Sequence, residues 1–179
     1  FFVIITLIIL SIPIIIISLL VLFTSTGPIL FWSDRIGIYN SIFKMPKFRT
    51  MKIDTPPLAT HLLSSSDKYV TKIGSFLRKN SLDELPQLWS IFKGEMTFVG
   101  PRPALFNQYD LIELRKKNGV DILKPGITGW AQINGRDNIT IEEKVNLDIH
   151  YLKNKSFFFD FKIIILTLIK VIIKDGISH

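Results

Sequence analysis

The sequence predicts a mostly helical α/β fold with little sheet, headed by a membrane helix, and three observations support this. The first is the apolar run from Phe1 to Phe23, which contains no charged residue. The second is that apolar residues recur at helical spacing in most later segments, whereas only 41–51 and 96–99 read as strands. The third is that no strand is followed by a glycine-rich phosphate loop, so a Rossmann core is not expected.

The chain of 179 residues divides into a membrane segment, 1–23, and one body, 24–179. Residues 1–33 contain no Asp, Glu, Lys or Arg, so all 22 basic and 15 acidic residues lie in the body, which carries the net charge of +7. A basic body behind an apolar segment suits an anionic membrane surface and a polyanionic substrate. No nucleic-acid-binding motif is recognisable, so nucleic acid is not expected as a partner. The lack of cysteine excludes disulfides and thiolate metal sites.

The apolar run is long enough to enter or cross a membrane, because 23 helical residues extend about 35 Å. It is too long for the core of a cleaved signal peptide. Pro13 removes a backbone donor and predicts a kink near the middle. A kinked spanning helix and a re-entrant helix both remain open, and a buried core helix is the soluble alternative. The basic residues that follow favour the cytoplasmic side of the membrane; they are Arg35, Lys44, Lys47, Arg49 and Lys52.

Short elements alternate with turns in the first part of the body. In chain order we expect a turn at 24–28, an apolar stretch at 29–32, a turn at 34–37, a strand within 41–51, a loop at 54–67 and a helix at 68–79. Ser81 is then expected to cap the next helix, with Glu84 completing a capping box and Gly94 ending the helix. The predicted buried face of that helix consists of Leu82, Leu85, Leu88, Trp89 and Phe92.

The second part of the body reads as further helices around one strand. In chain order we expect a strand at 96–99, a helix within 104–118, a loop at 125–129, a helix at 139–153 and a helical apolar tail at 158–174. Lys162, Lys170 and Lys174 share one face of the tail. An amphipathic helix at the membrane interface and a core helix with a lysine edge fit this pattern equally well.

The candidate site is the adjacent carboxylate pair Asp83 and Glu84, which lies between Arg78 and Arg102 in the sequence. Two acidic residues at a helix start commonly serve only as caps. Carboxylates can also attack, accept protons or hold a divalent metal, and arginines neutralise phosphate oxygens. The pair therefore fits chemistry on a phosphorylated substrate.

Five motifs in order extend this interpretation over nearly the whole chain. They are Lys47-Phe48-Arg49-Thr50-Met51, Ser81-Leu82-Asp83-Glu84-Leu85-Pro86-Gln87, Gly100-Pro101-Arg102-Pro103, Pro125-Gly126-Ile127-Thr128-Gly129 and Gln132-Ile133-Asn134-Gly135-Arg136. With these motifs the chain resembles the sugar-transferase domain of bacterial phosphoglycosyl transferases. In the small monotopic members of that family a Ser-Pro break makes the membrane helix re-entrant, whereas this chain has Ser11-Ile12-Pro13. In larger members the equivalent segment follows several spanning helices, and the chain can be the C-terminal piece of such a protein.

The resemblance implies a reaction and its participants. Asp83 would attack the β-phosphorus of a UDP-sugar, release UMP and hold the phosphosugar for a polyprenol phosphate, undecaprenyl phosphate in a bacterium. Mg²⁺ would screen the approaching anions, with Asp83 as its protein ligand. Glu84 would either orient the acceptor or take its proton. The expected phosphate-binding residues are Lys47, Arg78, Arg102 and Arg136.

The resemblance further places the protein in the bacterial inner membrane, with its catalytic domain on the cytoplasmic face and a role in starting glycan assembly. Asp160 matches an acidic position of the family. The alternative is a non-catalytic basic adaptor that binds anionic lipid. A conventional glycosyltransferase is disfavoured because no Asp-x-Asp tripeptide occurs. The sequence does not distinguish the sugar, and it leaves a homo-oligomer open.

Overall fold

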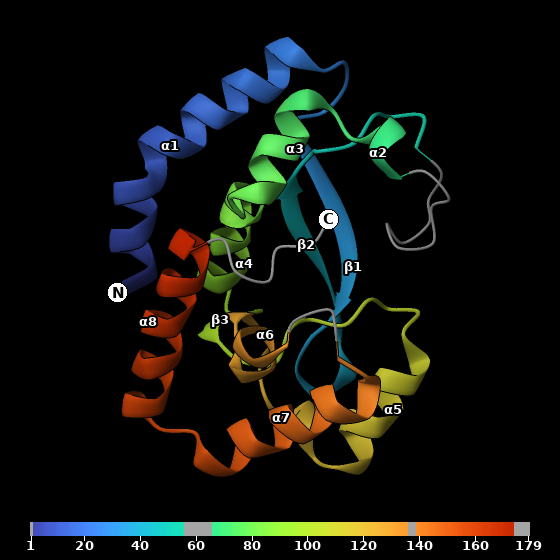
Figure 1. Ribbon diagram of the computed structural model, residues 1–179, viewed down its shortest axis with the longest axis vertical. Coiled ribbons are helices and arrows are strands. Elements are labelled where there is room, and N and C mark those ends of the chain that lie inside the picture. Colours follow the sequence, from blue (N-terminus) through green and yellow to red (C-terminus); the bar gives the residue numbers. More distant parts are fainter. Residues whose placement is uncertain (1, 56–65, 136–138, 174–179) are drawn as a thin grey trace. The chain divides into compact units, whose positions relative to one another are not determined.

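The computed structural model describes residues 2–55, 66–135 and 139–173, which form two compact units (Figure 1). Within these residues, unit 1 contains 2–32, 46–55 and 66–88, and unit 2 contains 33–45, 89–135 and 139–173. The predicted loop at 54–67 lies mostly outside the described residues, as does Arg136. The chain is mostly helical with two small sheets, which confirms the predicted fold class.

Unit 1 carries the apolar helix and most of the first predicted elements. Its helices are α1 (Phe2–Thr24), α2 (Ser66–Tyr69), α3 (Lys72–Lys79) and the 3-10 segment η3 (Leu82–Gln87). The helix expected at 68–79 is interrupted, because the Thr71 side chain accepts a hydrogen bond from the Gly74 N–H and so caps a new helix, α3. Strands β1 (Leu30–Ile36) and β2 (Ile42–Phe48), each of which has residues in both units, pair in a two-stranded sheet through the short turn η1 (Ile38–Asn40) of unit 2. β1 therefore continues to Ile36, over most of the segment 34–37 where a turn was predicted.

Helix α1 runs without a break through Pro13 and packs only its C-terminal half on the unit 1 core (Figure 1). Ile17 and Val21 are buried with Phe48 and Leu77, and α1 contacts α3. Most other α1 side chains are exposed. α1 is long and apolar enough to cross a membrane. This agrees with the membrane-type helix expected from the sequence, whereas the choice between spanning and re-entrant geometry stays a prediction.

Unit 2 contains the remaining elements. They are the end of α4 (Leu88–Phe92), β3 (Thr97–Val99), α5 (Tyr109–Lys117), η4 (Val120–Ile122), β4 (Gly126–Thr128), α6 (Trp130–Asn134), α7 (Ile141–Asn154) and α8 (Phe157–Ile173). β3 and β4 pair in parallel, with Thr97 opposite Gly126 and Val99 opposite Thr128. The loop predicted at 125–129 is therefore wrong: this segment contains a strand, and its partner lies far away in the sequence.

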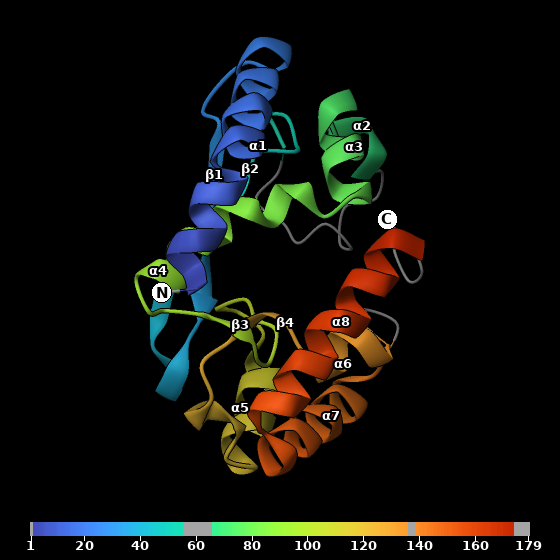
Figure 2. The same ribbon diagram turned by 90° about the vertical axis from the view of Figure 1, so that its left-hand side faces the viewer.

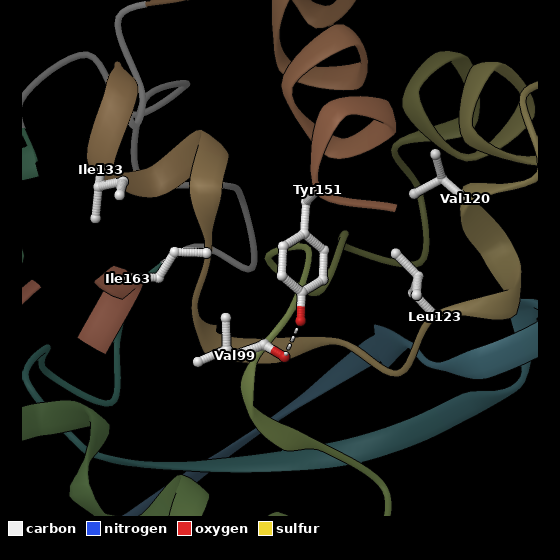
Figure 3. Close-up of a cluster of buried hydrophobic side chains, with 6 residues drawn as sticks. All are labelled: Val99, Val120, Leu123, Ile133, Tyr151 and Ile163. Atoms are coloured by element: carbon white, nitrogen blue, oxygen red, sulfur yellow. Dashed lines mark hydrogen bonds between the residues drawn. The ribbon is translucent and has the colours of Figure 1, made fainter. Parts of the chain in front are cut away.

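The core of unit 2 forms where α6, α7 and α8 meet the β3–β4 pair (Figure 2). Its central side chain is Tyr151, packed with Val99, Val120, Leu123, Ile133 and Ile163 (Figure 3). The Tyr151 hydroxyl lies 3.2 Å from the Val99 carbonyl oxygen and 2.8 Å from Oδ1 of Asp160. Asp160, the acidic position singled out in the sequence, thus accepts a hydrogen bond that joins α7 to α8.

Two aromatic residues lie differently from the prediction. Trp89 and Phe92 of α4 were expected to be buried, yet each is half exposed, and their rings stack 5.5 Å apart. The reason is that α4 ends at Phe92 after five residues, before Gly94 at φ +78°. A helix this short cannot bury a full apolar stripe.

Candidate functional site

The carboxylate pair lies on η3, and its local structure is not the predicted capping box. Ser81 adopts a left-handed conformation (φ 54°) and its side chain makes no cap hydrogen bond. The backbone of η3 instead begins with the Glu84 N–H donating to the Ser81 carbonyl. The predicted capping box, which needs the Ser81 side chain, is therefore not formed.

Lys47 of β2 pairs with both carboxylates. Its Nζ lies 2.8 Å from Oε1 of Glu84 and 3.9 Å from Oδ2 of Asp83. Asp83 is buried, with 8% of its surface exposed. The structure therefore brings Lys47 to two other predicted site residues, Asp83 and Glu84, which follow it by 36 and 37 positions in the sequence.

Arg78, in the last turn of α3, completes the charged cluster of unit 1. Its Nε donates to Oγ1 of Thr50 at 2.9 Å, which fixes the guanidinium beside the strand that carries Lys47. Burial lowers the pKa of Arg78, and the charge of Asp83 opposes that effect. A guanidinium stays protonated under all ordinary conditions, so Arg78 contributes a fixed positive charge.

Burial also dominates the electrostatics of Asp83. It raises the pKa of the Asp83 carboxyl above its ordinary value. Lys47 and Arg78 pull this pKa down, whereas the neighbouring Glu84 pushes it up. A partly desolvated carboxylate held between two cations is suited to act as a nucleophile or a metal ligand.

One residue of the first motif, Arg49, has a structural position that the sequence did not indicate. It is buried, and Nη2 donates to the carbonyl and the hydroxyl of Ser25 at 2.9 and 2.7 Å. Arg49 thus ties the end of β2 to the C-terminal end of α1, where a cation is favoured by the helix dipole. In the sequence Arg49 shares a motif with Lys47. Only the fold shows that Arg49 bonds to Ser25 whereas Lys47 bonds to the carboxylates.

The other two predicted phosphate-binding residues are not part of this cluster as the structure describes it. Arg102 belongs to unit 2, where it is partly buried in the loop that follows β3. Arg136 lies outside the described residues. The charged cluster therefore consists of Lys47, Arg78, Asp83 and Glu84, all in unit 1.

The glycines near Arg102 are needed for close backbone packing. A Cβ on Gly129 would lie 2.1 Å from the Gly100 carbonyl oxygen, and a Cβ on Gly126 would lie 2.1 Å from the Gly100 nitrogen. The segments after β3 and around β4 therefore approach each other more closely than any side chain permits. Gly126 is the first residue of strand β4 and does not lie in a turn.

The donor set fits a divalent cation held only in part by protein. Among the described residues, no group of three or more His, Cys, Asp or Glu side chains could hold a metal ion. Asp83 and Glu84 nevertheless offer adjacent carboxylates. Mg²⁺ commonly takes one or two carboxylates and completes its shell with water and substrate phosphates.

These features define a class of protein. A buried Asp83 and a partly buried Glu84 beside a lysine and an arginine, in a unit that also carries a long apolar helix, fit a membrane-associated transferase that acts on phosphorylated substrates.

Comparison with known proteins then gives the family. Residues 1–174 match the model of the bacterial sugar transferase family, and the chain belongs to this family. It is 41% identical over 169 residues to an uncharacterised sugar transferase, EpsL, of Bacillus subtilis (strain 168), covering 90% of this chain and 82% of that protein.

Two other relatives are much longer than this chain. A UDP-glucose:undecaprenyl-phosphate glucose-1-phosphate transferase of Escherichia coli (strain K12) is 43% identical over 166 residues, which cover 86% of this chain and 35% of that protein. A galactosyl transferase, CpsE, of Streptococcus agalactiae serotype III (strain NEM316) is 40% identical over 84% of this chain and 36% of its own length. The chain thus spans about a third of these two relatives. The family and the class of enzyme expected from the motifs, a sugar transferase, are confirmed.

Proposed function

We propose that this protein transfers a sugar phosphate from a UDP-sugar to a membrane polyprenol phosphate, undecaprenyl phosphate in a bacterium, and thereby starts the assembly of a glycan. The observation that carries the proposal is the burial of Asp83 against Lys47 and beside Glu84. Relatives named for glucose and for galactose transfer support the reaction class. They leave the sugar of this chain to experiment.

In the first step a carboxylate oxygen of Asp83 attacks the β-phosphorus of the UDP-sugar. The bond between that phosphorus and the bridging oxygen breaks, and UMP leaves with the bridging oxygen and its electron pair. The product is an acyl phosphate in which Asp83 carries the phosphosugar. A carboxylate is a suitable nucleophile because it is ionised near neutral pH and divides one difficult displacement into two easier ones.

In the second step a phosphate oxygen of the polyprenol phosphate attacks the same phosphorus. The bond to Asp83 breaks, the carboxylate is regenerated, and a polyprenyl diphosphosugar is formed. Lys47 holds the Glu84 carboxylate in place at 2.8 Å, so we assign Glu84 the role of orienting the acceptor.

Cations must offset the repulsion between the carboxylate and the diphosphate. Lys47 and Arg78 supply fixed positive charge in unit 1, and we assign Arg102 and Arg136 to the phosphates as well. Such charge is the usual source of rate in phosphoryl transfer. Mg²⁺, bound by Asp83 and the substrate phosphates, would supply further charge neutralisation.

The membrane location of the reaction rests on two helices. α1 is almost wholly apolar and mostly exposed outside its contact with the unit 1 core. In unit 2, α8 buries Ile163 but exposes Phe158, Phe161 and Leu168, which favours a position in the interface over an ordinary core helix. The basic residues after α1 favour the cytoplasmic face.

The test is release of UMP from a panel of UDP-sugars by the full chain in detergent, with Mg²⁺ and a short-chain polyprenol phosphate. Wild type is compared with Asp83→Asn and with Asp110→Asn, a control that neutralises an exposed carboxylate on α5. We expect one sugar to give UMP with wild type and the control. Asp83→Asn should lower that release at least about a thousandfold, because removing a nucleophile removes the two-step route.

Two results would count against the proposal. If Asp83→Asn releases UMP as fast as wild type, Asp83 is not the nucleophile. If folded wild type binds anionic vesicles but releases UMP from no donor, the protein behaves as the basic adaptor. The adaptor function gives no reason for a buried Asp83.

A further inference from the structure

The loop that carries Arg102 has four successive carbonyl groups, and each one accepts a hydrogen bond from a different part of unit 2. The Pro101 carbonyl accepts from the Gly126 N–H at 2.9 Å, and the Ala104 carbonyl accepts from the Ile36 N–H at 3.0 Å. Between them, the Arg102 and Pro103 carbonyls accept from arginine side chains. Carbonyl groups in loops more commonly accept hydrogen bonds from water. A loop in which four successive carbonyls accept from protein donors is therefore unusual.

The two arginines reach the loop from separate elements. Nη1 of Arg115, on α5, donates to the Arg102 carbonyl at 2.9 Å. Nη1 of Arg35, on β1, donates to the Pro103 carbonyl at 3.2 Å, and its Nε donates to Oγ of Ser33 at 2.8 Å. With prolines on both sides of Arg102, the backbone there has little freedom left.

Arg115 is itself fixed by a buried partner. Its Nε and Nη2 both donate to Oδ2 of Asp148 on α7, at 3.0 and 2.7 Å. The Arg115 and Asp148 side chains are only 10% and 2% exposed. Because the guanidinium is planar and rigid, two bonds to Asp148 determine where its third nitrogen points.

We propose that Arg115, oriented by Asp148, is a positioning residue that holds the Arg102 carbonyl and so fixes the backbone from which the Arg102 side chain extends. This inference rests on the phosphate-binding role that the proposed function gives to Arg102. The other interpretation is an ion pair that only joins α5 to α7. An ion pair alone needs no third donor, whereas the bond to Arg102 uses the one guanidinium nitrogen that Asp148 does not contact.

Arg115→Lys separates the two interpretations. A lysine ammonium keeps the positive charge beside Asp148, but it is a single point donor and cannot span Asp148 and the Arg102 carbonyl as the guanidinium does. Leu111→Ala is the matched control, because Leu111 is buried on the same helix and packs in one cluster with Val145 of α7 and Ala104 of the loop. It removes apolar packing from α5, α7 and the loop, but it leaves the donors to the four loop carbonyls in place.

The experiment measures KM and kcat for UMP release, together with thermal unfolding, in wild type, Arg115→Lys, Arg102→Ala, the double variant and Leu111→Ala. We expect Arg115→Lys to raise KM for the donor about tenfold, the effect of one hydrogen bond. In the Arg102→Ala background the same substitution should change KM no further, because it acts through the Arg102 side chain. Leu111→Ala should lower the melting temperature and leave KM unchanged.

Hydrogen exchange supplies a readout that does not depend on activity. Arg115→Lys should speed exchange of the amides of residues 104–106 at least tenfold more than Leu111→Ala does. Unchanged KM and exchange in Arg115→Lys, or equal KM increases with and without Arg102, would overturn the inference. A wild type that releases no UMP contradicts the proposed function instead, and the exchange result still decides whether Arg115 holds the loop.

Discussion

The two units organise their candidate residues by different physical means. In unit 1, Asp83 and Glu84 are held by the charge of Lys47 and Arg78, and the contacts are between side chains. In unit 2, the Arg102 loop is held through its backbone, by close glycine packing and by donors to its carbonyls. Charged side chains can rearrange around a substrate, whereas a hydrogen-bonded backbone presents one geometry. In the proposed reaction, unit 1 would supply the reacting carboxylate and unit 2 a fixed backbone for Arg102.

The largest effect is expected in the buried ion pair of unit 2. Arg115→Met leaves Asp148 buried without its partner, and such losses cost about 3–5 kcal/mol. Chemical unfolding in detergent measures this free energy. Replacing both partners, as in Arg115→Met with Asp148→Leu, should recover most of it. Removal of the more exposed Lys93–Glu95 pair by Glu95→Gln should cost no more than about 1 kcal/mol. Equal losses of unfolding free energy for the two ion pairs would contradict the distinction between the buried pair and the more exposed one.

The next effect concerns the glycine contacts. Gly129→Ala places a Cβ 2.1 Å from the Gly100 carbonyl oxygen, and the strain should cost about 1–3 kcal/mol. Gly119→Asn is the control, because its Cβ would meet nothing within 4 Å and asparagine tolerates the left-handed conformation at φ +68°. Differential scanning calorimetry compares the two variants. A Gly129→Ala melting temperature equal to that of the control would show that the backbone can relax.

A smaller effect is expected from the core hydroxyl of unit 2. Tyr151→Phe removes the donor to Asp160 and should cost about 1–2 kcal/mol. Burial raises the pKa of Tyr151, so its hydroxyl remains a donor and the cost should be the same at pH 6 and pH 9. Unfolding free energies at both values test this. A cost that vanishes at pH 9 would mean that the hydroxyl ionises.

Of these substitutions, one that neutralises Asp83 should lower the free energy of unfolding least. Its pKa is raised in the folded protein, so the folded state binds a proton more tightly than the unfolded state. By linkage, the benefit of a protonated Asp83 is present at low pH and is lost as pH rises through the folded pKa. Asp83→Asn should therefore be as stable as wild type or more stable at pH 7, although inactive. A lower melting temperature at pH 7 would contradict this sign.

The same pKa predicts the shape of the pH–rate profile. In the proposed reaction Asp83 must be ionised to attack, so UMP release should fall on the acid side at a pH above the ordinary range of an aspartate. Lys47 lowers the Asp83 pKa, so Lys47→Met should move this acid limb to still higher pH. Profiles are compared after scaling each to its own maximum, because Lys47 is also a phosphate-binding candidate. If the acid limb moved to lower pH instead, Lys47 would not be lowering the pKa of Asp83.

Local patterns predicted the helices better than the strands. The helices expected within 104–118 and at 139–153 and 158–174 correspond to α5, α7 and α8, because apolar spacing and terminal residues act within a few turns. Strand β4 was missed, because its stabilising partner β3 is not a neighbour in the sequence. Ser81 was assigned to a cap on its residue type, yet its left-handed backbone excludes that role.

The site could be predicted only as a set of residue types. The motifs identified Lys47, Arg78, Asp83 and Glu84, but the contacts of Lys47 with both carboxylates result from tertiary folding. The sequence did not indicate Arg115 and Asp148, whose spacing of 33 positions carries no periodic signal. Phosphate binding remains a prediction for Lys47, Arg78, Arg102 and Arg136 alike.

The parallel pairing of β3 with β4 also has a consequence for synthesis on the ribosome. Thr97 and Gly126 pair across 29 positions, and the Pro101 carbonyl cannot accept from the Gly126 N–H until β4 has left the exit tunnel. Lys47, Asp83 and Glu84 are all translated before β3 begins. The nascent chain can therefore bring Lys47 to the two carboxylates while the Arg102 loop still lacks its bond to β4. Ribosome pauses placed before and after residue 128 would separate these two stages of maturation.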